Sequence, residues 1–270
     1  MRIFLIGLLV LVGACSDTES PQAPGEAPPW RFHSDFERAS TFMDLFPTDL
    51  SGWTNVQCVQ PDGTQSSAPS GLSVVSGSNR ISLDPSLAGL GAKAMKFEAP
   101  PTGSSVSKAS IAKQGVDFKP GDQVVVKFRL YLEDHGSAEN LFLMDLESME
   151  LSGYPGRRLA ISGSQELILE SKNAGGAYGS GPNVKPTSAS KVAVPKGQWV
   201  SIQVDLVLAR DDQGSVKIWQ DGLLVVEANG MTFPTEPDIT HYDWVEFGQT
   251  ANSSANAQTL WMDDISITRL

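Results

Sequence analysis

Charged side chains are concentrated in one otherwise apolar stretch of the sequence, LFLMDLESMELSGYPGRRL, which spans residues 141–159. The stretch predicts a strand, a loop and the start of a second strand, and it carries Asp145, Glu147, Arg157 and Arg158. Carboxylates can exchange protons with a substrate, and guanidinium groups bind carboxylates or phosphates through paired hydrogen bonds. The alternative is a cross-strand network of ion pairs that keeps a polar sheet face wet and in register. Both interpretations depend on the strands that position these side chains.

Alternation along a strand decides which of these charges share a face. It assigns the following residues of three successive segments to the core: Phe142, Met144, Leu146, Leu159, Ile161, Leu167 and Leu169. The opposite face receives Leu141, Leu143, Asp145, Glu147, Arg158, Ala160, Ile168, Glu170 and Lys172. Arg157 and Arg158 are neighbours and point opposite ways, so only one of them can line a groove.

Period-two alternation recurs along the chain and predicts half-buried antiparallel strands. It is clearest in 123–132 and 199–208, and 215–229 predicts a hairpin around Asp221-Gly222. Further strands are predicted at 94–98, 167–172, 244–248 and 259–268, and no segment of useful length has helical periodicity. The fold class is therefore all-β, a two-sheet antiparallel jelly-roll sandwich. Two long loops, 60–71 and 173–190, are candidate lids or binding loops.

If the charged strands neighbour 123–132, one sheet face collects cations, carboxylates and a tyrosine. Its members are Lys127, Arg129, Tyr131, Asp145, Glu147, Arg158, Glu170 and Lys172. Trp219 should point outward from its strand, where it could stack on a sugar ring or be covered by a loop. Trp199 and Trp261 are interpreted as structural.

The first 14 residues have the features of a secretory signal peptide, namely one positive charge, a short apolar run and small residues before Cys15. The sequence VGAC resembles a bacterial lipobox, in which cleavage precedes a cysteine that is then lipidated. Ser16 follows instead of Asp, which favours the outer membrane of the cell envelope. The alternatives are an ordinary signal peptide, or a disulfide between Cys15 and Cys58.

Residues 15–30 are rich in Pro, Ser, Glu and Ala and predict a disordered tether behind the lipid, which leaves 31–270 as a single jelly-roll domain. The formal net charge is −11, so the basic footprint of a nucleic-acid-binding protein is absent. The acidity also argues against a polyanionic ligand unless a basic groove exists locally. The expected partners are a polysaccharide and, through the N-terminal lipid, a membrane.

The order of segments in the second half resembles concanavalin-A-like jelly rolls of the lectin and glucanase type. The segments are LFLMDLES, YPGRRL, LILESK, GQWVSIQVDLVL, GSVKIWQDGLLV, GMTFP, VEFGQTANSS and LWMDDISI. More narrowly, the chain resembles bacterial extracellular proteins grouped with heparin-lyase-like polysaccharide lyases, over 35–270 and best after residue 141. The resemblance implies that a concave sheet offers a groove to a polysaccharide.

A groove of this type suits a uronic-acid polymer that is cleaved by β-elimination. The reaction needs a group that neutralises the uronate carboxylate, a base for the C5 proton and an acid for the leaving oxygen. Arg129 or Arg158 is a candidate neutraliser, Tyr131 or Tyr178 a candidate acid, and His135 or Tyr131 a candidate base. The chain lacks an obvious groove-facing histidine on a strand, which the lyase resemblance leads one to expect. No cofactor is required.

Related β-sandwich modules often pair their first and last strands and hold a structural Ca²⁺ between them. Asp35 and Glu37 near the start of the domain, with Asp263 and Asp264 at its end, are candidate ligands. The alternative is a bulged strand with one carboxylate bonding a turn.

Three functional hypotheses remain open. The first is a lipid-anchored envelope protein that binds a polysaccharide on its concave sheet, with or without cleavage of a uronate polymer by β-elimination. The second is a non-catalytic structural or interaction lipoprotein that keeps the fold. The third is a hydrolase, because Asp145 and Glu147 have the two-residue spacing of jelly-roll glucanase carboxylates, although the remainder of that motif is absent.

Overall fold

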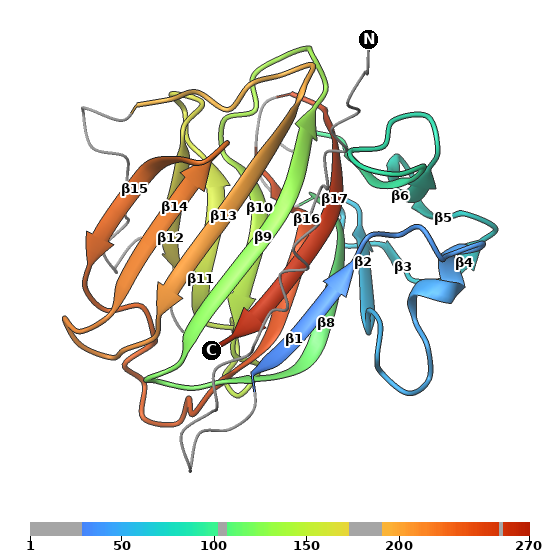
Figure 1. Ribbon diagram of the computed structural model, residues 1–270. Coiled ribbons are helices and arrows are strands. Elements are labelled where there is room, and N and C mark those ends of the chain that lie inside the picture. The colour runs from blue at the N-terminus through green and yellow to red at the C-terminus, as the bar shows by residue number, and fades with distance from the viewer. Residues whose placement is uncertain (1–28, 102–106, 173–190, 254–255) are drawn as a thin grey trace, which may run out of the picture.

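The computed structural model describes residues 29–101, 107–172, 191–253 and 256–270, and its strands form two antiparallel sheets packed face to face (Figure 1). This confirms the predicted all-β, two-sheet sandwich. The predicted leader, the predicted lipidation site Cys15 and most of the predicted tether lie outside the described residues. Within the described part, no helix has the length and apolar character needed to cross a membrane.

The two sheets, A and B, differ in width. Sheet A contains, in spatial order, β15 (Leu223–Asn229), β14 (Ser215–Gln220), β13 (Trp199–Val207), β9 (Gln123–Leu132), β17 (Gln258–Arg269), β7 (Ala94–Ala99), β6 (Asn79–Asp84), β5 (Ser73–Ser76) and β4 (Pro69–Ser70), with β1 (Trp30–Ser34) paired to β17. Sheet B contains β12 (Leu167–Lys172), β11 (Gly156–Ile161), β10 (Leu141–Glu147), β16 (Tyr242–Asn252), β8 (Ser107–Phe118), β2 (Asn55–Val59) and β3 (Gln65–Ser66). A short 3₁₀ helix, η1 (Phe42–Leu45), precedes β2.

The core lies between the sheets and is built by the alternating apolar residues that the sequence shows. In β9, every second residue from Val124 to Leu132 is buried, and β13 follows the same pattern from Val200 onward. Phe128 of sheet A meets Phe247 of sheet B edge-on, with ring centroids 5.9 Å apart. Alternation in each sheet therefore supplies one apolar face, and the two faces interlock.

The predicted hairpin around Asp221-Gly222 is confirmed. Both residues have positive φ, 49° and 77°, which suits a two-residue turn whose twist matches the flanking strands. The Asp221 carboxylate accepts a hydrogen bond of 2.8 Å from the backbone N–H of Ser201. This bond ties the turn to β13.

One arrangement predicted from the sequence is wrong. Strand β9 belongs to sheet A, between β13 and β17, whereas β10, β11 and β12 are neighbours in sheet B. Residues that point outward from β9 and from β10 therefore lie on opposite outer faces of the sandwich. Alternation predicts which face of its own sheet a residue occupies, but it contains no information about which sheet a strand joins.

Two further differences have physical causes. A register shift in β10 between Phe142 and Met144 breaks the alternation, so Leu141 and Leu143 join the core and Phe142 faces outward, the reverse of the prediction. Strand β8 was not predicted, because buried residues on both of its faces weaken the alternation of polar and apolar positions. The loop predicted at 60–71 contains the short strands β3 and β4, and the loop predicted at 173–190 lies outside the described residues.

Candidate functional site

The charged side chains of β10, β11 and β12 gather on the outer face of sheet B, as alternation predicted. In the hydrogen-bonded register, Glu147 lies opposite Gly156, and Gly156 lies opposite Lys172. In the adjacent row, Asp145 lies opposite Arg158. The structure therefore brings together four of the residues proposed from the sequence, on three neighbouring strands.

Three carboxylates meet at this face. One oxygen from each of Asp145, Glu147 and Glu246 lies within 4.8 Å of the others, and all three residues are buried. Glu246 joins the cluster because β16 pairs with β10 and sets Glu246 opposite Asp145. Removed from water and this close together, three negative charges require cations or protons to offset their repulsion.

Each carboxylate has a cationic partner. Arg158 Nε donates to Asp145 Oδ1 at 3.0 Å, Lys108 Nζ lies 3.4 Å from Glu246 Oε2, and Lys172 Nζ contacts Glu147 Oε1. The formal charges of the six groups cancel. A metal ion bound by the carboxylates would have to displace these side chains, so the donor set does not fit a metal centre as it stands.

The environment separates the pKa values of two of the carboxyl groups. Burial, with the neighbouring Asp145 charge, raises the pKa of Glu147 to about 8, and Lys172 offsets only part of this rise. Burial also acts on Asp145, but Arg158, Lys108 and Lys172 outweigh it and hold its pKa below the usual range. At neutral pH the cluster thus contains one firmly ionised carboxylate beside one that is mostly protonated.

Lys108 is the cation of this group that lies nearest to open space. Burial disfavours its charge, but Glu246 and the other two carboxylates outweigh burial and raise its pKa, so it remains an ammonium. Its Nζ also donates to Gln57 Oε1 at 3.0 Å. About a fifth of its side chain is exposed, 21%, whereas Glu246 has no exposed surface.

A cavity of about 430 Å³ opens above the cluster, and we call it the sheet B cavity. Its lining includes Lys108, Glu147, Gln114 and Trp244, and Tyr154 projects from the loop between β10 and β11. Tyr154 is 45% exposed and has a positive φ of 49°, a conformation that is uncommon for a residue with a side chain. The sheet B cavity thus combines an ammonium, a carboxyl group, an amide and a phenol.

Lys172 connects the buried charges with this phenol. Its Nζ contacts Glu147 and lies 5.7 Å from the centroid of the Tyr154 ring. Arg158, in contrast, lies in the floor, only 2% exposed, with its guanidinium 3.8 Å from the centroid of the Phe142 ring. Arg157 points to the opposite side of β11 and contacts the Ser171 hydroxyl and the Met231 carbonyl, as expected for adjacent strand residues.

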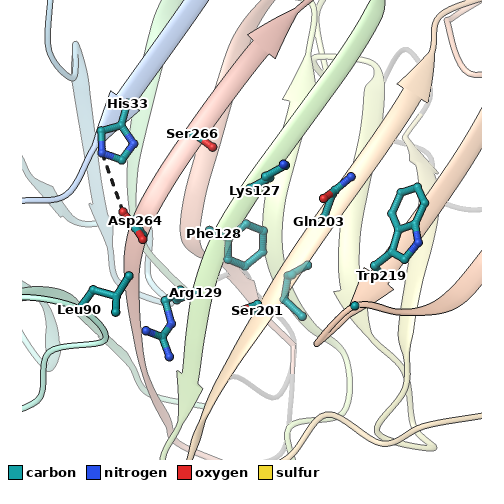
Figure 2. Close-up of a pocket in the computed structure, with 12 residues that line it drawn as sticks. His33, Leu90, Lys127, Phe128, Arg129, Ser201, Gln203, Trp219, Asp264 and Ser266 are labelled. Atoms are coloured by element: carbon teal, nitrogen blue, oxygen red, sulfur yellow. Dashed lines mark ion pairs between the residues drawn. The ribbon is translucent and has the colours of Figure 1, made fainter. Parts of the chain in front are cut away.

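The residues proposed from β9 and β14 lie elsewhere, and the prediction of a single shared face is wrong. Lys127, Arg129 and Trp219 line a separate cavity on the outer face of sheet A (Figure 2). Tyr131, on the same face, packs between Trp199 and Trp261, with ring-centroid distances of 5.7 and 5.4 Å. Lys127 and Trp219 point outward from their strands, as predicted. Their strands, however, belong to sheet A and not to the sheet that carries Asp145, Glu147 and Arg158.

His135, a further catalytic candidate, does not line either cavity. His135 is exposed in the turn after β9, with Nδ1 3.6 Å from Glu133 Oε2. Tyr178 and Cys15 lie outside the described residues. Cys58 is fully buried in the core, and its predicted alternatives, a free thiol or a disulfide with Cys15, both stay predictions.

Three of the four proposed calcium ligands accept hydrogen bonds within the protein, and the fourth, Asp264, lies near a histidine. Asp263 Oδ2 accepts from the backbone N–H groups of Gly89 and Leu90, and Glu37 Oε1 accepts from Ala92 and Lys93. Asp35 accepts from Glu37, and Asp264 Oδ1 lies 3.8 Å from His33 Nε2. The first and last strands do pair, and β17 is irregular between Asp263 and Ser266. Calcium binding by these residues stays a prediction.

The structure also bears on the hydrolase hypothesis. Asp145 has no exposed surface, and its Oδ1 accepts hydrogen bonds from both Arg158 and Thr250 at 3.0 Å. A carboxylate held in this way cannot reach a glycosidic carbon. The two-residue spacing therefore places Asp145 and Glu147 together without making them a glycosidase pair.

Several residues of the sheet B cavity and of the carboxylate cluster beneath it were absent from the sequence-based prediction. Lys108 and Gln114 belong to β8 and Glu246 to β16, and Tyr154 lies in the irregular loop YPG. A signal did exist in β8, where Lys108, Ser110 and Gln114 fall at period two within an apolar setting. Predicting residues 107–118 as a strand would have placed Lys108 and Gln114 on one face as candidate site residues.

A family model described as polysaccharide lyase matches residues 46–266. The match covers most of the chain and includes both sheets, so the protein belongs to the polysaccharide lyase family. Membership supports a protein that binds or cleaves a polysaccharide. No curated protein sequence matches the chain.

Solved structures with similar folds include several uronate lyases. An endo-β-1,4-glucuronan lyase from the fungus Trichoderma reesei is 15% identical, with 80% of this chain and 94% of that chain covered and a TM-score of 0.58. A family 7 alginate lyase, A1-II′, is 13% identical, with 86% and 97% covered and a TM-score of 0.54. An alginate lyase from Aplysia kurodai is 14% identical, with 88% and 97% covered and a TM-score of 0.54. At these identities the likeness establishes the jelly-roll fold alone.

Proposed function

We propose that the protein is a lipid-anchored polysaccharide lyase of the cell envelope, which cleaves a uronic-acid polymer by β-elimination in the sheet B cavity. The observation that carries the proposal is the convergence of Lys108, Glu147 and Tyr154 on one cavity in a member of the polysaccharide lyase family. The glucuronan and alginate lyases with similar folds support the choice of a uronate substrate.

The first requirement of β-elimination is neutralisation of the uronate carboxylate, which makes the C5 proton acidic. The ammonium of Lys108 is suited to this role because it stays charged and partly exposed at the cavity. The Gln114 amide lines the same cavity and can donate a hydrogen bond to the second carboxylate oxygen. Fixed donors of this kind stabilise the negative charge that develops as the proton leaves.

The second requirement is proton transfer, and Tyr154 is the exposed group of the cavity that can perform it. The Tyr154 phenolate oxygen takes the C5 proton, the C5–H electron pair forms the C4–C5 double bond, and the C4–O pair leaves with the oxygen, which then receives a proton from the Tyr154 O–H so that the phenolate is restored. We assign Tyr154 to both proton transfers. Glu147 is a positioning residue, because it holds the Lys172 ammonium beside the Tyr154 ring.

The test is the ultraviolet absorbance of the unsaturated uronate product, with a soluble form that starts at Ser16. Alginate, glucuronan and heparin serve as substrates, and Lys108→Met is compared with wild type and with Lys217→Met, an exposed lysine on the other sheet. We expect absorbance to rise with one polymer and the initial rate to fall about 10²–10³-fold in Lys108→Met only. Equal rates in Lys108→Met and wild type would exclude the proposed site.

The same soluble protein, tested for absorbance and in affinity gels, distinguishes two alternative functions. A flat absorbance on every polymer, together with retardation of the protein in a gel containing one of them, identifies a non-catalytic binding protein. No absorbance and no retardation favour a structural or interaction lipoprotein. Including Ca²⁺ in one series and a chelator in a parallel series tests the predicted structural calcium.

Lipidation at Cys15 and an outer-membrane location are further parts of the proposal. They rest on the sequence VGAC, in which the cleavage point lies directly before Cys15, and on Ser16 after the cysteine. Full-length protein expressed in a diderm bacterium should incorporate a labelled fatty acid and fractionate with the outer membrane. Cys15→Ser should lose both properties, and retention of the label in that variant would contradict lipidation at this residue.

A further inference from the structure

Five polar or aromatic side chains form a row across five neighbouring strands on the outer face of sheet A. His33 of β1 is in register with Ser266 of β17, Ser266 with Lys127 of β9, Lys127 with Gln203 of β13, and Gln203 with Trp219 of β14. Figure 2 shows these side chains one after another across the strands. Residues directly opposite each other in antiparallel strands project from the same face, so the row is a property of the register.

The row is long and narrow, and its side chains line a cavity on the outer face of sheet A. Neighbouring strands are about 4.7–4.9 Å apart, so four steps span about 19 Å, a length that suits several linked sugar rings better than one. The five side chains line a cavity of about 710 Å³, with Arg129 and Ser201 in the adjacent row and Leu90 from the loop before β7. We call this hollow the sheet A cavity.

The chemistry of the row suits a carboxylated sugar chain. Trp219 is partly exposed and offers a flat apolar face on which a pyranose ring can stack. Lys127 is exposed and makes no ion pair with any residue that the structure describes. The Gln203 amide and the Ser266 hydroxyl can exchange hydrogen bonds with sugar hydroxyls.

The local charge is opposite to that of the whole chain. Lys127 and Arg129 line the cavity, and Asp264, 3.8 Å from His33, is the acidic residue in the described lining. The chain as a whole carries a formal net charge of −11, which would repel an anionic polymer from most of the surface. Two cations beside an exposed indole therefore mark the place on this face where a polyanion can bind.

We propose that the sheet A cavity is a second, non-catalytic binding site for a carboxylated polysaccharide. It lies on the opposite outer face from the sheet B cavity, and the two cavities share no lining residue. One polymer segment cannot fill both across the sandwich, so the second site holds another segment or another chain. That the bound polymer is also the substrate cleaved in the sheet B cavity rests on the proposed function. The existence of a binding site on sheet A does not depend on it.

The experiment compares four forms of the soluble protein: wild type, Lys127→Met, Trp219→Ala and the control Lys217→Met. Lys217 lies on the same strand and face as Trp219 but is paired with Glu227 at 3.1 Å outside the cavity. Each form is run in affinity gels that contain glucuronan, alginate or a neutral glucan. Cleavage of a short uronate oligosaccharide is measured in parallel.

The expected result is retardation of wild type and Lys217→Met by an acidic polymer, with about tenfold weaker retardation of Lys127→Met and Trp219→Ala. Cleavage of the short oligosaccharide should stay at the wild-type rate in all four. Lys127→Met alters an exposed side chain, so its folding is not in question if Trp219→Ala proves unstable. Equal retardation of all forms, or equal retardation by the neutral glucan, would overturn the proposal.

The outcomes separate this proposal from the lyase proposal. Retardation that depends on Lys127 and Trp219 in a protein that cleaves nothing retains the sheet A site and removes the lyase function. Cleavage with retardation that is unchanged in Lys127→Met and Trp219→Ala retains the lyase and removes the sheet A site.

Discussion

Lys172 reaches Glu147 across Gly156, which lies between them in the register of β12, β11 and β10. A Cβ atom on Gly156 would lie 1.9 Å from the Leu146 carbonyl oxygen, so no side chain can occupy this position without a shift of backbone. The missing side chain leaves a passage over β11 for the lysine. One glycine thereby allows an ammonium to be held between a buried carboxyl group and the phenol of Tyr154.

The raised pKa of Glu147 predicts a pH-dependent stability. Its ordinary pKa is 4.5 and burial raises it to about 8, so between these values the folded state retains a proton that the unfolded state has lost. The stabilisation is complete below pH 4.5 and disappears as the pH rises through about 8. Glu147→Gln stays neutral at every pH and should remove this slope, on the order of 5 kcal/mol in the free energy of unfolding over the whole interval.

Urea denaturation across this pH interval measures the slope directly. Glu227→Gln is the matched control, because Glu227 is more than half exposed in its pair with Lys217. We expect the control to keep the wild-type dependence. Parallel curves for wild type and Glu147→Gln would show that Glu147 is ionised in the folded protein at neutral pH.

The buried pair of Asp145 and Arg158 predicts a large loss of stability when one charge is removed. Asp145→Asn keeps the shape of the side chain but leaves the Arg158 guanidinium beside a neutral amide at a site where both residues are almost completely buried. Breaking a buried pair in this way costs about 3–5 kcal/mol. The free energy of unfolding should therefore fall by that amount at neutral pH.

The control for Asp145→Asn is Lys217→Met, which removes one charge from a solvent-exposed pair on the other sheet. Exposed pairs contribute about 0–1 kcal/mol, so the control should unfold close to wild type. Denaturant titration followed by tryptophan fluorescence gives both values. A loss below about 1 kcal/mol in Asp145→Asn would mean that solvent reaches the pair and screens it.

Tyr154→Phe and Tyr131→Phe test which tyrosine transfers a proton. Tyr154 projects into the sheet B cavity, whereas Tyr131 packs between two tryptophans on the opposite sheet. Loss of a positioned proton-transfer group reduces kcat about 10²–10⁴-fold, and removal of one hydroxyl should leave KM within a few-fold. Tyr131→Phe should retain the wild-type kcat. A loss of kcat in Tyr131→Phe, with the wild-type kcat retained in Tyr154→Phe, would place catalysis on the outer face of sheet A.

The comparison of sequence and structure shows which information alternation contains. It placed Glu147, Arg158 and Lys172 on one face because each position depends only on its own strand and on the neighbours in a short hairpin series. It could not place Lys127 correctly, because membership of β9 in sheet A results from pairing with β13 and β17, far away in the chain. Long-range pairing is a tertiary property and leaves no periodic signal.

The missed residues illustrate a second limit. Lys108 and Glu246 lie on β8 and β16, strands that are buried on both faces and so lack the contrast between polar and apolar positions. The bulge at Leu143 reverses the orientation of Phe142. No glycine or other turn residue at positions 142–144 indicates a bulge from the sequence. Buried charge on a strand whose two faces are both covered thus weakens the contrast that alternation needs.

The last prediction concerns the thiol of Cys58, which is fully buried in the core beside the Val74 carbonyl. Burial raises its pKa from 9.0 to about 11, a difference of two units that lowers the thiolate fraction about 100-fold. The form that starts at Ser16 contains this thiol alone, because the sequence has two cysteines and Cys15 is removed. A thiol reagent should therefore label the native protein at least about 100-fold more slowly than the urea-unfolded protein. Rapid labelling of one equivalent under native conditions would show that the contact between β2 and β5 opens locally, while Cys58→Ser should show no labelling in either state.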